Sequence, residues 1–274
     1  MDQSLFERYL RILGVSREEP CRAALFRLTH EHLTRIPFEN ISKLYYRNRF
    51  SQRSIIPLDM YLDGIEKYNF GGTCYSNNYH MYNLLNHLGY RVKLCSADIA
   101  VESAPPDAHM VSIVALDGEE FIVDVGYAAP LWQPLPRFLN EDFVIELGYE
   151  KYILKPWDGN GAQSLELYRH GELKHGYRLK SEPRDINFFT DVIARSYSEQ
   201  AAFMNAVALV RFFDDSALII RNLTLTEFSG NTFKTEAIES RDRLIAVIEN
   251  RFGIPASITV DALAQMSQFR SLWG

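Results

Sequence analysis

Hydrophobic positions recur every three to four residues through the first ninety residues, which is the spacing of amphipathic helices. Three stretches show this spacing, and each ends at a helix-stopping residue. They run over residues 5–13 before Gly14, from Pro20 to Pro37, and from Cys74 to Gly89. The pattern predicts a small helical unit at the start of the chain.

After Gly89 the period of the hydrophobic positions changes from helical to alternating, which favours strands. The predicted strands cover residues 92–97, 109–116, 120–125, 152–154 and 165–168. Asp117-Gly118, Asp158-Gly159 and His170-Gly171 are turn signals between strands. We expect the middle of the chain to be β-rich and to form a barrel.

From about residue 185 the pattern mixes helices and strands. The expected elements are a helix over 185–195, strands over 203–212 and 217–225 with Asp214-Asp215 as a turn, and helices over 241–252 and 261–272. The whole chain is therefore expected to be α+β. We divide it into a helical unit (1–89), a β unit (90–190) and an α/β unit (191–274).

Composition and charge argue against several classes of function. The 274 residues carry a formal net charge of -6 and no run of Lys or Arg, so no nucleic-acid partner is expected. No apolar run approaches the ~18 residues that span a bilayer, and the N-terminus has no secretory pattern. We expect a cytoplasmic protein without a membrane partner, whose three scattered cysteines are reduced.

Cys74 occupies the most suggestive position for chemistry. Gly71 and Gly72 lead it directly into the start of the third predicted helix. The partial positive charge at a helix N-terminus favours the thiolate, which is the nucleophilic form of cysteine. A small buried hydrophobic residue is the alternative interpretation of a free cysteine. A nucleophile would need a base nearby.

A predicted hairpin supplies a histidine and a carboxylate. With a two-residue Asp117-Gly118 turn, Leu116 pairs with Glu119, and the register places His109 and Asp124 as diagonal neighbours on one face. An aspartate in an apolar strand is costly to bury without a partner. On the hairpin alone, a satisfied buried pair is a better explanation than catalysis. Together with Cys74 it gives the constellation used for covalent acyl transfer, in which a base activates the thiol and a carboxylate orients the base.

The sequence lacks the motifs of other common functional sites. No HExxH or CxxC pair is present, and we predict no metal. Gly71-Gly72 belongs to neither a GxGxxG nor a GxxxxGK[ST] phosphate loop.

Several short motifs, taken together, resemble those of the arylamine N-acetyltransferases. They are Ile36-Pro37-Phe38-Glu39-Asn40, Gly71-Gly72-Thr73-Cys74 with Asn78, His109-Met110 and Val123-Asp124-Val125-Gly126-Tyr127. A weaker likeness continues through Tyr197-Ser198, Phe203, Arg211 and Arg251-Phe252-Gly253-Ile254. The motifs occur in the family's order and at close to its spacing.

The resemblance implies an N-terminal helical bundle, a central β-barrel and a C-terminal α/β lid around a cysteine-protease-like catalytic core. It implies ping-pong transfer of acetyl from acetyl-CoA to a small arylamine or arylhydrazine, a reaction of xenobiotic metabolism, in a monomer or homodimer. Carried over singly, Cys74 is the nucleophile, His109 the base and Asp124 its orienting group. Phe38 and Tyr127 fall where the family lines its acceptor pocket, although core packing explains them equally.

Two positions depart from the family pattern. Phe70 stands where the family has an arginine before the glycines, and Ser76 where it has an acidic or amide residue. Glu39 is therefore expected either to lack a partner or to pair with Arg35 or Lys67. Two other functions stay open, namely a related thiol-dependent amide synthase and a degenerate acyltransferase-like protein that binds ligand without turnover.

Overall fold

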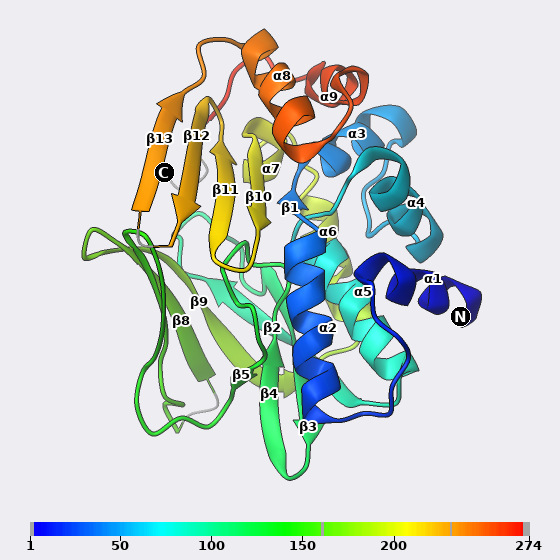
Figure 1. The fold of residues 1–274 in the computed structure, drawn as a ribbon, viewed down its shortest axis with the longest axis vertical. Helices are drawn as coiled ribbons and strands as arrows, with labels where there is room; N and C mark the ends of the chain where they lie inside the picture. The colour runs from blue at the N-terminus through cyan, green and yellow to red at the C-terminus, as the bar shows by residue number, and fades with distance from the viewer. Residues whose placement is uncertain (1–2, 160–161, 231, 271–274) are drawn as a thin grey trace.

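The structure is a computed structural model that describes residues 3–159, 162–230 and 232–270. It is an α+β fold in which most helices gather beside two antiparallel sheets, one of eight strands and one of five (Figure 1). No helix of the described ranges is both long and apolar enough to cross a membrane. The division into three units remains a prediction.

The first part of the chain is helical, as predicted. Its helices are α1 (Gln3–Leu13), α2 (Arg22–Arg35), α3 (Ile41–Phe50), α4 (Leu58–Tyr68) and α5 (Cys74–His87). The three predicted stretches correspond to α1, α2 and α5, and α1 ends at Leu13, directly before Gly14 with φ of 68°. We did not predict α3 or α4. In α3 every residue from Ile41 to Tyr46 is buried, including the polar Ser42 and Lys43, so polar and apolar residues do not separate into the two faces that reveal a helical period.

The eight-stranded sheet has the order β5-β4-β3-β2-β9-β8-β7-β6. Its strands are β2 (Arg91–Ile99), β3 (His109–Leu116), β4 (Glu119–Val123), β5 (Leu135–Pro136), β6 (Phe143–Leu147), β7 (Glu150–Leu154), β8 (Ala162–Arg169) and β9 (Glu172–Pro183). The five strands expected from the alternating pattern all exist. The sheet curls into a half-barrel with edges at β5 and β6, so the expected barrel is present only in this open form (Figure 1).

The last part of the chain carries the five-stranded sheet, in the order β1-β10-β11-β12-β13, with helices packed beside it. The elements are η1, a 3₁₀ helix (Ile186–Phe189), α6 (Thr190–Arg195), α7 (Ala202–Asn205), β10 (Ala208–Phe212), β11 (Ser216–Arg221), β12 (Thr224–Ser229), β13 (Thr232–Ala237), α8 (Arg241–Phe252) and α9 (Ala256–Leu263). The prediction for α8 was correct at both ends.

Three boundaries predicted in this part were wrong. Phe203 lies in α7 rather than in a strand, and a turn at Asn222 divides the expected strand 217–225 between β11 and β12. The last predicted helix, 261–272, is α9, which follows Pro255 and ends at Leu263. Proline favours a helix start because its φ is preset, and this signal was overlooked. Residues 271 and 272 of that prediction lie outside the described residues.

One strand of the C-terminal sheet comes from the N-terminal part of the chain. The short β1 (Phe38–Glu39) pairs with β10, with Phe38 opposite Val210. Asn40, directly after β1, donates from Nδ2 to the carbonyls of Phe203 and Ala206 and accepts from the amide of Ala208. This junction fixes the segment before α3 against β10, and α5 packs on β2 and β3 beside it (Figure 1).

Candidate active site

Close approach of two backbone segments places Cys74 at the start of α5. The amide of Glu39 donates to the carbonyl of Gly72 over 3.1 Å. A Cβ at Gly71 would lie 1.8 Å from the carbonyl oxygen of Pro37, so a side chain at that position does not fit. The glycines therefore allow the loop to lie against β1 before the helix begins. The predicted position of Cys74 at a helix N-terminus is confirmed.

The hairpin forms with the predicted short turn. Asp117 and Gly118 have positive φ angles of 52° and 84°, as a two-residue hairpin turn requires, and Leu116 pairs with Glu119. The ladder ends where Ser112 pairs with Val123, one residue before Asp124. His109 and Asp124 meet as expected, with 2.8 Å between His109 Nε2 and Asp124 Oδ2.

Asn78 links α5 to the His109–Asp124 pair. Its Nδ2 donates to Asp124 Oδ1 over 2.8 Å and to the carbonyl of Met110 over 2.6 Å. Its Oδ1 accepts from the amide of Val125 over 2.8 Å. Asn78 belongs to the motif that follows Cys74, but its bonding role was not predicted. Its spacing of four residues from Cys74 puts both on one helix face, a signal that was available in the sequence.

The charges of His109 and Asp124 stabilise each other. Burial lowers the pKa of His109, but the charge of Asp124, their hydrogen bond and a hydrogen bond with Cys74 outweigh it and raise the pKa well above 6.5. Burial raises the pKa of Asp124, yet His109, Asn78 and the amide of Gly126 hold it below its usual value. The imidazolium and carboxylate forms are thus both favoured, although the exposed fractions of the two residues are 1% and 2%.

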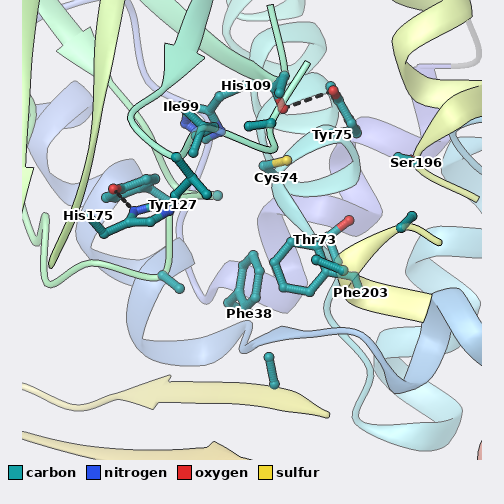
Figure 2. A pocket seen from close by; sticks show the side chains of 18 of the residues that line it. Phe38, Thr73, Cys74, Tyr75, Ile99, His109, Tyr127, His175, Ser196 and Phe203 are labelled. Atoms are coloured by element: carbon teal, nitrogen blue, oxygen red, sulfur yellow. Dashed lines mark hydrogen bonds between the residues drawn. The ribbon is translucent and has the colours of Figure 1, made fainter. Parts of the chain in front are cut away.

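A cavity of about 570 Å³ surrounds the thiol and is lined by Phe38, Cys74, His109 and Tyr127. Asp124 lies behind His109 and is not among the lining residues. Figure 2 shows Cys74 with Phe38 and His109 around it, and Tyr127 beside His175. The ring centroids of His109 and Tyr127 are 5.4 Å apart, and Tyr127 Oη is hydrogen-bonded to His175 Nδ1. The predicted site residues therefore converge in one place.

Phe70, which departs from the family pattern, is buried in a cluster of aromatic rings. Its ring centroid lies 5.8 Å from those of Tyr45 and Tyr46 and 5.3 Å from that of Tyr68. Ser76 lies against the other glycine of the loop, since a Cβ at Gly72 would be 2.8 Å from Ser76 Cβ. Phe70 therefore makes aromatic contacts at the position where the family pattern has an arginine.

Glu39 braces the nucleophile loop without a cationic partner in the described part of the chain. Its carboxylate accepts from the amide of Ser42 over 2.8 Å and from that of Gly71 over 3.1 Å. The expectation that Arg35 or Lys67 substitutes for the arginine was wrong, because they pair with Glu31 and Asp63. Burial raises the pKa of Glu39 even though these hydrogen bonds lower it.

Within the described ranges, no group of three or more His, Cys, Asp or Glu residues is arranged to hold a metal ion.

Sequence comparisons relate the chain to acetyltransferases. The sequence model of a family described as N-acetyltransferase matches residues 23–260. The arylamine N-acetyltransferase pineal gland isozyme NAT-3 of Gallus gallus is 30% identical over 205 residues, covering 67% of this chain and 68% of that protein. The arylamine N-acetyltransferase of Escherichia coli (strain K12) is 24% identical over 254 residues, covering 85% and 84% respectively.

The fold is also similar to that of a solved arylamine N-acetyltransferase. The solved structure of M. smegmatis arylamine N-acetyl transferase has a TM-score of 0.78 at 22% identity, covering 98% of this chain and 100% of that one. Fold and sequence together define an N-acetyltransferase. The chain belongs to the arylamine N-acetyltransferase family and is a transferase of that family.

Proposed function

We propose that the protein transfers an acetyl group from acetyl-CoA to the nitrogen of an arylamine or arylhydrazine, through a thioester on Cys74. The observation that carries this proposal is the convergence of Cys74, His109 and Asp124 beside a cavity that Cys74 and His109 line, with the cysteine at a helix N-terminus. This arrangement can produce a thiolate and imidazolium pair, which is the activated form of a cysteine nucleophile.

In the first half-reaction His109 accepts the proton of the Cys74 thiol, and the thiolate attacks the thioester carbonyl of acetyl-CoA. The C–S bond to CoA breaks, His109 returns the proton to the departing CoA thiolate, and acetyl-Cys74 remains. Asp124 holds the His109 ring in position and stabilises its charge. Backbone N–H groups in the first turn of α5 would donate to the oxyanion, because the first amides of a helix have no partner within it.

In the second half-reaction the acceptor nitrogen attacks the acetyl carbon and loses its proton to His109. Cys74 then leaves as the thiolate, and the enzyme returns to its starting state with the amide as product. Phe38 and Tyr127 line the cavity beside the thiol, where they would contact the aromatic ring of the acceptor. The nucleophile comes from the start of α5, His109 from β3 and Asp124 from the residue after β4, an arrangement that would suit a cysteine-protease-like core.

The proposal is tested by mass spectrometry of the intact protein after mixing with acetyl-CoA and then with an arylhydrazine. We expect one acetyl adduct on Cys74 that disappears when the acceptor is added, with formation of the acetylated hydrazine. The Cys74→Ala variant is the control and should gain no adduct.

The other outcomes of this experiment would support a different function or a different nucleophile. An adduct that persists with every arylamine and arylhydrazine would favour the related amide synthase. A protein that binds CoA and never gains the adduct would be the degenerate binding protein. Equal labelling of the Cys74→Ala variant would overturn the assignment of the nucleophile.

A further inference from the structure

Lys43 is a buried cation in the wall of the cavity that contains Cys74. It lies in α3, and its exposed fraction is only 6%. Its Nζ donates to Ser196 Oγ over 2.7 Å and lies 4.2 Å from the centroid of the Tyr197 ring. Both partners are neutral, and no described carboxylate forms an ion pair with it. An ammonium group has three donors, so this environment leaves bonding capacity toward the cavity.

Burying an ammonium group without a counter-ion is costly, so its presence needs a reason. Burial lowers the pKa of Lys43 to about 8, although the negative charge available at Cys74 raises it. The cation–π contact with Tyr197 compensates only part of the lost hydration. An anionic ligand in the cavity would supply the missing partner.

The ionisable residues around the cavity favour an anion. Apart from histidine, tyrosine and the cysteine, its lining residues that carry a charge are Lys43, Arg169, Arg195, Arg221 and Arg270. No Asp or Glu is among the described residues that line it, in a chain of net charge -6. Arg169 and Arg221 are already paired with Glu150. Lys43 differs from these two because it has no acidic partner among the described residues, and from Arg195 and Arg270 because it is buried while they are exposed.

The location of Lys43 restricts which anion it can meet. The phosphates of a CoA molecule are separated from its sulfur by the whole pantetheine arm, so a cation close to the reacting thiol does not face them. Lys43, its partner Ser196 and Cys74 all line the same cavity, and the charge of Cys74 contributes to the pKa of Lys43. In the view of Figure 2, Ser196 lies across Cys74 from Tyr127 and His175. The group that reaches Lys43 therefore belongs to the acyl group or to the acceptor.

We propose that Lys43 binds a carboxylate on a substrate held at Cys74 and makes the enzyme selective for substrates that carry one. This inference rests on the proposed acyl transfer. The carboxylate can belong to the acceptor, as in an aminobenzoate, or to the acyl group, as in malonyl. A charge-assisted hydrogen bond from Lys43 would orient either one beside the sulfur.

The test compares matched substrates in the wild type and in Lys43→Met. The acceptor arm uses 4-aminobenzoate against 4-aminobenzamide, and the donor arm uses malonyl-CoA against butyryl-CoA. We expect Lys43→Met to reduce the kcat/KM ratio of the charged over the neutral member about 10- to 100-fold in one arm, the effect of losing a hydrogen bond to a charged group. The arm that responds identifies the source of the carboxylate. Lys43→Arg keeps the charge and should restore most of the ratio.

Arg195→Met is the matched control, because it removes another cation from the same cavity wall. It should change the ratio by less than threefold. The inference is overturned if Lys43→Met leaves both ratios within threefold of the wild type, which is the result expected if Lys43 only ties α3 to the end of α6. Equal changes in Arg195→Met and Lys43→Met would also overturn it, since a general loss of positive potential would then explain them.

A binding measurement separates this inference from the proposed reaction. In the Cys74→Ala variant no acyl transfer can occur, so the rise in Tm reports binding alone. We expect the charged member of one pair to raise the Tm more than its neutral partner. Equal shifts within both pairs would overturn the role of Lys43 even if the wild type forms the acetyl adduct. This comparison stays informative if Lys43→Met does not fold.

Discussion

At the residue scale, Asp124 decides the charge state of His109. Oδ2 of Asp124 contacts the imidazole, while Oδ1 accepts from Asn78 and from the amide of Gly126. Three hydrogen bonds thus hold the carboxylate, so it cannot rotate away from the ring without losing some of them. The histidine is held as a cation in an environment whose burial alone would make it neutral.

Replacing Asp124 with Asn should lower the pKa of His109, because the negative charge is removed and the burial effect remains. The imidazolium then loses its proton at a lower pH, and acetyl transfer should fall about 10²- to 10⁴-fold. NMR titration of the His109 ring in the two proteins measures the pKa, and the steady-state rate measures the activity. An unchanged pKa of His109 in Asp124→Asn would contradict this account of the pair.

Glu39 should make stability depend on pH. Its folded pKa is raised above the unfolded value of 4.5, so the folded protein binds the proton more tightly than the unfolded chain does. The stabilisation is fully present below pH 4.5 and is lost as the pH rises through the folded pKa. Urea unfolding at several pH values should show this loss in the wild type and not in Glu39→Gln. Parallel pH profiles of the free energy of unfolding would contradict the prediction.

At the element scale, the site depends on how closely the end of the hairpin approaches the start of α5. A Cβ on Gly126 would lie 2.8 Å from Cys74 Cα, 2.9 Å from Cys74 O and 2.8 Å from Asn78 Nδ2. Two of these atoms are backbone atoms of the nucleophile, so a larger residue would displace the residue that reacts. Gly126 therefore sets the distance between the end of the hairpin and the start of α5.

Gly126→Ala should lower the rate of acetyl transfer at least tenfold, because a displacement of about 1 Å at a reacting group is costly. Overpacking should also reduce the free energy of unfolding by about 1–3 kcal/mol. Gly118→Ala is the control at the other end of the hairpin. There the φ of +84° is unfavourable for alanine but no atom lies within 4 Å of the added Cβ.

Gly118→Ala should therefore lose about 1 kcal/mol of stability and keep its activity. Thermal unfolding and the acetyl-transfer rate distinguish the two variants. Equal losses of activity in both would show that general destabilisation is responsible.

At the scale of the whole molecule, the junction around β1 joins distant parts of the chain. Asn40 satisfies three backbone groups between Phe203 and Ala208. Tyr197 Oη donates to the carbonyl of Ser54, and α3 packs against α9. Asn40, α3 and Ser54, which all precede Cys74 in the chain, are thus fixed by contacts with the last third of the sequence.

Asn40→Ala should lower the free energy of unfolding by about 2–4 kcal/mol, since it leaves several buried backbone groups without partners. Amide hydrogen exchange should accelerate most at β1 and β10. Asn48→Ala removes two bonds to the carbonyls of Asp261 and Ala262 at a more exposed place and is the control. If exchange at β10 is unchanged in Asn40→Ala, the junction does not hold the sheet.

Local signals account for what the sequence predicted well. The end of α8 was predicted from Gly253, which has a φ of 73°, and the structure shows Ser240 as the N-cap, whose Oγ accepts from the amide of Arg243. The hairpin register followed from its two-residue turn. By contrast, α3 is buried on all sides from Ile41 to Tyr46 and β1 has only two residues, so neither has a period to recognise. Pairing of β1 with β10 depends on contacts across more than half of the chain.

The sequence by itself determined the chemistry available to this protein. A thiol after two glycines and a histidine and an aspartate in one hairpin are arranged by helix-start and turn geometry, which neighbouring residues encode. Only the tertiary structure decided what surrounds them. Glu39 is braced by backbone amides and Lys43 is buried without an acidic partner in the part of the chain that the structure describes, because burial and the lack of a counter-ion depend on which distant segments pack together.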